Sequence, residues 1–441
     1  MAGGRKRVMV PLVLGLAAAV VAVSLFVLVQ WRQDLEQSGL GAVEAPSAPV
    51  ALDPSAPREG RFTTRVSYTA MGAPADANVS TEVAWDDDWF FEDPTVYNHE
   101  LARTCSVLSA IANSESAYYQ AGSDSPAYME QAMAQLGLGE VSTASYRYRS
   151  EIVDEVVEFL TRGDDVVAYS VASKRLMNSA TGEAKTLLLV SVRGSYGAEW
   201  LSDANMGDPS ELDLDQADHL GFADAAQEIV EELGSRLDEL VGQGVTSDDV
   251  ALLFCGHSRG AATANLAAAY ADDMAQGLRV IAPTSSIYAY TFATPTVTTM
   301  GNVRDPLYDN IFNVLNPSDM VPRLPLASWG FARYGRDLWL PEEGGEGFEA
   351  LHASMRERYC ANVGVESPSV PGDVARVDAF ERDLAAQIPT QDDFGSLGGV
   401  GALARDLLLD MNAMQVLTSH YPNTYIAWMQ AVGQDDLRTS R

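Results

Sequence analysis

The feature that most constrains the fold is a serine between two glycines, in the stretch Gly256–Gly260, with a different kind of sequence on each side. The run Val250–Cys255 before it is entirely apolar, which is typical of a strand buried on both faces. The Ala-rich run Ala261–Ala269 after it favours a helix. A serine at so sharp a strand-to-helix turn is strained, and glycines two positions away leave it room. The first N–H groups of the helix would lie beside the Ser258 oxygen, which suits a nucleophile next to a developing negative charge. A chance Gly-x-Ser-x-Gly match is the alternative interpretation.

The same alternation of apolar strands and amphipathic helices extends over most of the chain. Further strand patterns cover residues 165–171, 186–192, 286–292 and 310–315. Helical spacing covers residues 98–119, 125–136, 152–160 and 222–240. Strands that alternate with helices predict an α/β fold, with a mostly parallel sheet and helices on both of its faces. Residues 61–83 alternate only weakly, so they predict either an edge strand or an irregular segment.

A serine becomes a nucleophile only with a base and an orienting acid elsewhere in the chain. On this type of fold the three residues follow the chain order serine, acid, histidine. Asp319 comes shortly after the predicted strand 310–315, and an acid past a strand's carboxyl end lies at the same sheet edge as Ser258. Asp305 and Asp309 precede that strand and would lie at the opposite edge. Asp319 is therefore the candidate acid.

Five histidines are available as the base. His99 and His219 precede the serine, and His257 lies within the turn, with its side chain expected to point away from the serine. His352 lies in an Arg/Glu-rich helical pattern that is typical of a surface. His420 lies in a loop-like stretch before a C-terminal helix, and it is the preferred base.

The N-terminus combines a basic end with a long apolar run. Residues 1–7 contain three basic side chains, and the following run Val8–Val29 contains no charge. As a helix this run would be roughly 33 Å long at about 1.5 Å per residue, enough to cross a bilayer. It predicts a single-pass signal anchor over residues 8–30, with the catalytic part of the chain outside the cytoplasm. The alternative is a signal peptide that is cleaved before secretion. The Ala/Pro-rich residues 31–60 predict an extended linker.

Charge and cysteine content narrow the range of partners. A net charge of -32 argues against binding to nucleic acid and against electrostatic docking on anionic lipid. None of the three cysteines has metal-site spacing, so neither a metal nor a cofactor is expected. Cys255 falls in the apolar strand and is expected to be a core residue. Cys105 and Cys360 could pair outside the cell.

Taken in order, these motifs resemble the class 3, or fungal-type, lipase branch of the α/β-hydrolase superfamily, and especially its bacterial lipase-like proteins. The resemblance covers roughly residues 85–433. The matching stretches are Val192–Ser195, Glu199–Asp203, His219–Phe222, Gly256–Gly260, Tyr290–Pro295, Asn316–Pro325 and Ser419–His420.

The resemblance implies a site as well as a fold. The implied catalytic triad is Ser258, Asp319 and His420. The implied turn around the nucleophile consists of Gly256, His257 and Gly260. Ser195 would be the first residue of the oxyanion hole, and the backbone N–H of Arg259 would be its second donor. His219 would belong to a structural turn and not to the triad.

The sequence departs from the family pattern in two places. Arg259 stands where a leucine is usual, which keeps the backbone donor but adds a charge near the pocket. The stretch between Asp319 and His420 is long, so the lipase-like domain over residues 61–441 is expected to carry an insertion at about 326–415.

The function expected from these residues is hydrolysis of lipid-type carboxylic esters through an acyl-serine intermediate, with no cofactor. Two alternatives remain: a serine peptidase or envelope-polymer esterase that uses the same triad, or a surface binding protein on an inactive hydrolase scaffold. The oligomeric state is not predicted.

A lid that opens at lipid follows the oxyanion strand in the resembled lipases. The matching stretch here, Ala204–Asp218, contains five acidic residues and only three sizeable apolar ones. A helix that enters lipid needs a broad apolar face, so we expect no strong activation at an oil–water interface. A later apolar cluster is either an acyl-binding wall or ordinary core. It consists of Trp329, Phe331, Tyr334, Leu338, Trp339 and Leu340.

Overall fold

The computed structural model of the chain describes residues 55, 57–70, 78–121, 127–144, 168–194, 220–390 and 418–440. Several predictions made above fall outside these residues. They are the signal anchor over 8–30, most of the linker over 31–60, the helix over 152–160, the lid stretch Ala204–Asp218, and Ser195. Within the described ranges, no helix is long and apolar enough to span a membrane.

An eight-stranded sheet forms the centre of the fold, in the order β10-β9-β8-β7-β6-β5-β4-β3. Its strands are β3 (Gly139–Ala144), β4 (Tyr169–Met177), β5 (Ala184–Val192), β6 (Val250–His257), β7 (Ile287–Phe292), β8 (Ile311–Leu315), β9 (Arg336–Trp339) and β10 (Arg438–Ser440). The strands from β5 to β9 run parallel, whereas β3 and β4 at one edge and β10 at the other pair antiparallel. The prediction of a mostly parallel sheet is confirmed. The strand predicted over residues 165–171 corresponds to β4, which spans Tyr169–Met177.

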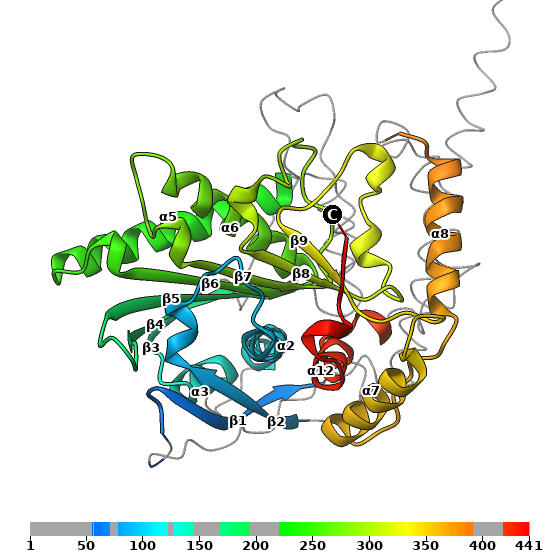
Figure 1. Ribbon diagram of the computed structural model, residues 1–441, viewed down its shortest axis with the longest axis horizontal. Coiled ribbons are helices and arrows are strands. Elements are labelled where there is room, and N and C mark those ends of the chain that lie inside the picture. The colour runs from blue at the N-terminus through cyan, green and yellow to red at the C-terminus, as the bar shows by residue number, and fades with distance from the viewer. Residues whose placement is uncertain are drawn as a thin grey trace, which may run out of the picture.

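Helices cover both faces of this sheet, as Figure 1 shows. On one face lie α5 (Leu220–Gly242) and α6 (Arg259–Ala275), and on the other lie α2 (His99–Ala121) and α12 (Pro422–Ala431). Farther out on the α2 side are α3 (Tyr128–Gln135), α7 (Phe348–Val363) and the two-stranded hairpin of β1 (Arg61–Thr69) and β2 (Asn78–Asp86). The helix α8 (Asp373–Gln387) lies at the right-hand edge of the view. The predicted edge strand over residues 61–83 is therefore replaced by β1 and the first part of β2, which pair with each other and not with the main sheet.

The position of β6 between two helical layers explains its apolar sequence. Leu253 and Cys255 point into the core shared with α2, whereas Leu252 and Phe254 point into the core under α5 and α6. All four side chains are fully buried. Successive side chains of a strand point to opposite faces, so a central strand that is covered on both sides is apolar at every position.

A buried ion pair fixes the N-terminal hairpin to the main sheet. Lys174 of β4 lies 2.8 Å from the carboxylate of Asp87, which directly follows β2. The indole N–H of Trp85 donates to the same carboxylate at 2.7 Å. Both charged side chains are buried. Loss of either partner would leave an uncompensated buried charge, so this contact holds the hairpin in one position.

His352, which was expected at the surface, has a partner inside the fold, and so does His99. His352 in α7 is buried and stacks on Phe348, with the ring centroids 5.3 Å apart. His99 begins α2, and its Nε2 lies 3.2 Å from the backbone oxygen of Met429 in α12. The buried face of α7 consists of side chains that recur every three or four residues, but the charged residues between them favoured a surface interpretation of His352.

The cysteines do not form the pair that was considered. All three are free, with Cys105 and Cys255 buried and Cys360 exposed. Burial raises the pKa of the Cys105 thiol well above its usual range, and the neighbouring Cys255 adds to the shift. Cys105 therefore faces the core of the sheet and not Cys360, and the prediction that Cys255 is a core residue is confirmed.

Candidate active site

The backbone at Ser258 has the strained geometry that the flanking glycines permit. Ser258 stands between β6 and α6 with φ 58° and ψ −130°, a conformation that non-glycine residues rarely adopt. A Cβ atom on Gly256 would lie 2.3 Å from the backbone oxygen of Gly260. A Cβ atom on Gly260 would lie 2.4 Å from the backbone oxygen of Val192 in β5. Both positions therefore require glycine, because the backbone itself occupies the space of a side chain.

The three residues proposed as a triad lie within hydrogen-bond distance of one another. His420 Nε2 is 2.8 Å from Ser258 Oγ, and His420 Nδ1 is 2.8 Å from Asp319 Oδ2. The three side chains come from the ends of β6 and β8 and from the turn before α12, and all are buried. A carboxylate accepts from Nδ1–H, which leaves Nε2 to accept the serine proton. In this arrangement His420 can take the proton of Ser258 when the serine oxygen attacks an electrophile.

Asp319 is held by two more donors besides His420. Its Oδ2 accepts a hydrogen bond from the hydroxyl of Tyr425 at 2.8 Å, and its Oδ1 accepts from the backbone N–H of Val321 at 2.9 Å. Burial raises the pKa of Tyr425 well above its usual value, and the charge of Asp319 raises it further. The phenol therefore stays protonated and remains a donor to the carboxylate.

The side chain of His257, which was predicted to point away from Ser258, reaches the histidine of the triad. Its Nε2 donates a hydrogen bond of 2.7 Å to the backbone oxygen of His420, and the two rings lie 4.8 Å apart. Burial lowers the pKa of His257 well below its usual value, and the nearby His420 lowers it further. His257 is therefore a neutral donor near the triad.

Of the two residues predicted to form the oxyanion hole, the structure describes Arg259 but not Ser195. Arg259 is the first residue of α6, so its N–H belongs to the first turn of the helix, at the positive end of the helix dipole. Ser195 lies outside the described residues, but its neighbour Gly194 lies beside the nucleophile. A Cβ atom on Gly194 would be 3.3 Å from Ser258 Cβ. The role of Ser195 stays a prediction.

Most of the apolar cluster expected after Asp319 is core. Tyr334 packs in the core under α5 and α6, and Leu338 and Leu340 belong to the core on the opposite face of the sheet. Phe331 is also buried, whereas Trp329 and Trp339 are only partly buried. These positions favour the core interpretation over an acyl-binding wall for at least four of the six residues.

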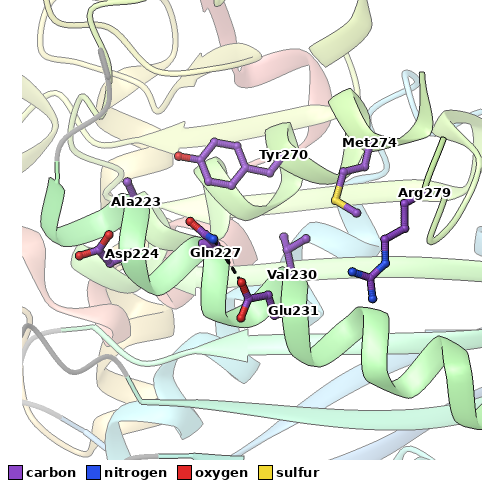
Figure 2. Close-up of a pocket in the computed structure, with 8 residues that line it drawn as sticks. All are labelled: Ala223, Asp224, Gln227, Val230, Glu231, Tyr270, Met274 and Arg279. Atoms are coloured by element: carbon purple, nitrogen blue, oxygen red, sulfur yellow. Dashed lines mark hydrogen bonds between the residues drawn. The ribbon is translucent and has the colours of Figure 1, made fainter. Parts of the chain in front are cut away.

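A cavity of about 340 Å³ lies between α5 and α6. In Figure 2, Gln227 and Glu231 project from α5, and Tyr270 and Met274 project from α6. Tyr270 lies about three turns along α6 from Ser258. None of the residues lining this cavity belongs to the triad, so it is separate from the Ser258 site.

Several residues that shape the site were not identified from sequence patterns. Tyr425 was assigned to the loop-like stretch around His420 and is found in α12, and Asn316 was within a recognised motif, but neither pattern indicates a hydrogen-bond partner. Asn316 Nδ2 donates to the backbone oxygen of Ser419 at 3.0 Å. Such contacts depend on how loops from different strands approach one another, which residue spacing does not encode.

One family model and several known lipases match part of this chain. The model of the family Lipase (class 3) matches residues 189–329. The secreted mono- and diacylglycerol lipase A of Penicillium cyclopium is 31% identical over 168 residues, which cover 36% of this chain and 50% of that protein. A lipase of Rhizomucor miehei is 27% identical over 201 residues, which cover 43% of this chain and 52% of that protein. The chain thus spans about half the length of the curated relatives it matches.

Solved structures of lipases are also similar at low sequence identity. A triacylglycerol lipase whose catalytic centre is described as a serine protease triad is 21% identical, with a TM-score of 0.37, over 56% of this chain and 82% of that one. A mutant form of the Penicillium cyclopium enzyme is 22% identical, with a TM-score of 0.35, over 57% of this chain and 86% of that one. The match to the class 3 lipase family covers residues 189–329, and this range includes the strand-to-helix turn at Ser258 in the mostly parallel sheet.

Proposed function

We propose that the chain is a serine hydrolase that cleaves carboxylic esters of lipids, with Ser258, His420 and Asp319 as its catalytic triad. The observation that carries the proposal is the continuous hydrogen-bond chain from Ser258 Oγ through both ring nitrogens of His420 to Asp319 Oδ2. The match to the class 3 lipase family adds independent support, because it rests on residues 189–329 and does not include His420.

The reaction would proceed by two acyl transfers. Ser258 Oγ attacks the ester carbonyl carbon while His420 Nε2 takes its proton, and Asp319 stabilises the imidazolium that forms. The carbonyl oxygen becomes an oxyanion beside the N-terminus of α6, where the N–H of Arg259 is the proposed donor. Collapse of this intermediate breaks the bond to the alcohol, which takes the proton from His420. Water then attacks the acyl-serine with His420 again as base, and collapse releases the fatty acid and restores Ser258.

The proposed substrates are small acylglycerols. The relative from Penicillium cyclopium is named a mono- and diacylglycerol lipase. The direct test is a panel of p-nitrophenyl esters with increasing chain length, followed by mono-, di- and triacylglycerols, with Ser258→Ala as the control. Hydrolysis of these esters by the wild-type chain and not by the variant supports the proposal. Cleavage of peptides or acylated cell-envelope polymers without cleavage of any simple ester would contradict it and favour the alternatives.

We further propose that the catalytic domain acts outside the cytoplasm, tethered by the apolar run Val8–Val29. The support for export is that curated relatives are named secreted lipases. The support for a tether is the length of the uncharged run behind a basic end. Fractionation of cells and protease treatment of intact cells test both points. Full-length protein free in the medium, or protein protected from protease inside the cell, would contradict the tethered arrangement.

A further inference from the structure

The turn that carries His420 has an unusual set of backbone contacts. Residues 418–420 are helical, and the chain then breaks at Tyr421 before α12 begins at Pro422. The last carbonyl groups of a helix have no partner within the helix. The structure supplies side-chain donors instead: His257 Nε2 to the oxygen of His420 at 2.7 Å, Asn316 Nδ2 to the oxygen of Ser419 at 3.0 Å, and Thr424 Oγ1 to the oxygen of Thr418 at 2.6 Å.

Two of these donors belong to the segments that carry the other members of the triad. His257 directly precedes Ser258 at the end of β6, and Asn316 follows β8 three residues before Asp319. Asn316 is itself held in place, because its Oδ1 accepts from the backbone N–H of Ser318 at 3.1 Å, and its own N–H donates to the Tyr425 hydroxyl at 3.0 Å. Each donor therefore ties the turn of His420 to one of the two strands from which its reaction partners come.

We propose that His257 and Asn316 are positioning residues that clamp the helical turn at Ser419–His420, and so set the distance from the His420 ring to both Ser258 and Asp319. The inference rests on the proposed function and adds to it two residues that do not touch the substrate. His420 lies more than a hundred residues from both Ser258 and Asp319 in the chain, so the chain itself does not hold its ring beside them. Its ring position therefore depends on contacts between loops.

The chemistry of His257 suits this task. Its Nε2 must be the protonated ring nitrogen, since a carbonyl oxygen only accepts. It is buried, and its ring lies 4.8 Å from that of His420 and 5.5 Å from that of Tyr425. A charged donor there would oppose the imidazolium that His420 must form. The lowered pKa of His257, caused mainly by burial, keeps it neutral.

The test compares variants that keep or lose the donor at position 257. His257→Leu removes the donor at similar volume, whereas His257→Gln keeps an amide N–H at nearly the same reach. We expect His257→Leu to lower kcat by about 10- to 100-fold with KM within about twofold, because a displacement on the order of 1 Å costs about that much. His257→Gln should stay within about threefold of the wild type. Turnover is normalised to the fraction of folded protein, measured by circular dichroism, which separates misplacement of His420 from loss of folded protein.

A matched control is available in the same chain. His99 makes the same kind of bond, from Nε2 to the backbone oxygen of Met429, but at the far end of α12. His99→Leu should lower thermal stability without changing kcat per folded molecule. Equal losses of kcat in His99→Leu and His257→Leu, or an equal loss in His257→Gln, would overturn the proposal.

The two clamp residues should also behave as one unit. Asn316→Ala should lower kcat in the same way, and the double variant with His257→Leu should lose less than the product of the two single effects. A fully multiplicative loss would mean separate roles and would contradict a shared clamp.

A readout without turnover keeps this inference distinct from the proposed function. The Nδ1 proton of His420, bonded to Asp319, is expected as a low-field resonance in the proton NMR spectrum. It should persist in His257→Gln and His99→Leu and broaden or shift in His257→Leu. An unchanged resonance in His257→Leu refutes the clamp even if the wild type hydrolyses esters. Wild-type protein that shows the resonance but cleaves no ester refutes the proposed function alone.

Discussion

The hydroxyl of Tyr425 lies 2.8 Å from Oδ2 of Asp319, the same oxygen that receives His420 Nδ1. Both Tyr425 and Asp319 are buried. A carboxylate inside a protein needs donors in place of water, and Tyr425 supplies one from the helix that follows the catalytic histidine. The acid is thus held by the same element that delivers the base.

Removal of that donor should weaken catalysis without abolishing it. A hydrogen bond to a charged group is worth about 1.5–3 kcal/mol, so we expect Tyr425→Phe to lower kcat/KM by roughly 10- to 100-fold. The measurement is steady-state hydrolysis of a short-chain p-nitrophenyl ester, with melting temperature as the check on folding. Full activity in a folded Tyr425→Phe variant would show that Asp319 needs no second donor from the side chains.

The triad should fail as a unit. Ser258→Ala, Asp319→Asn and His420→Ala should each lose most of the turnover, and double variants should lose little more, because the three groups act on one proton transfer. The control is His352→Ala, since His352 packs against Phe348 and lies in α7. It should keep kcat while losing stability. An inactive but folded His352→Ala beside an active His420→Ala would reverse the assignment of the base.

A buried carboxyl far from the triad should give the fold a pH dependence. Burial raises the pKa of Asp272 from 3.8 to about 8, and the neighbouring Asp273 adds to the shift. The amide of Asn310 donates to Asp272 Oδ1 at 3.2 Å, while Asp272 Oδ2 and Asn310 Oδ1 are buried without a hydrogen-bond partner. A proton on Asp272 removes the negative charge that burial disfavours.

The sign of the effect follows from proton linkage. The folded state keeps this proton up to about pH 8, whereas the unfolded chain releases it near pH 4, so the free energy of unfolding falls as pH rises between these values. The slope from this one group is at most about 1.4 kcal/mol per pH unit. Asp272→Asn imitates the protonated acid and should flatten the curve in that window, as measured by urea unfolding from pH 5 to 9. Parallel curves for the variant and the wild type would show that Asp272 stays ionised in the fold.

The stretch Ala204–Asp218 leads to a prediction about lipid surfaces. Its five acidic and three sizeable apolar residues form too narrow an apolar face to insert into lipid. We expect the rate on a short-chain triglyceride to change smoothly as the substrate concentration crosses its solubility limit. A steep rise that begins only when droplets form would refute this expectation.

The sequence predicts the central part of this structure well because a few patterns there are unambiguous. The apolar run of β6 has only one stable position, the middle of a doubly covered sheet, and the glycines around Ser258 mark a turn where backbone segments touch. The short acid-bearing segment after β8 follows from the rule that parallel strands meet at one edge. These features are local, and local patterns are what a sequence displays directly.

Contacts between distant segments are harder to predict. The hairpin of β1 and β2 was missed because weak alternation does not indicate which strand a segment pairs with. His352 was assigned to the surface because its neighbours are charged, yet it faces Trp428 and Phe348 in the folded chain. The link from His257 to His420 joins residues 163 positions apart, and it depends on the approach of two loops that no residue spacing records.

In the proposed mechanism Ser258 is a nucleophile activated by His420. Labelling with a fluorophosphonate, followed by digestion and mass spectrometry, tests it most directly, because the reagent forms a bond only with an activated serine. We expect one phosphonyl adduct, on the peptide that contains Ser258, and none in folded Ser258→Ala or, on the same timescale, in His420→Ala. No adduct on the folded wild-type chain, or an adduct on another serine that persists in Ser258→Ala, would contradict it.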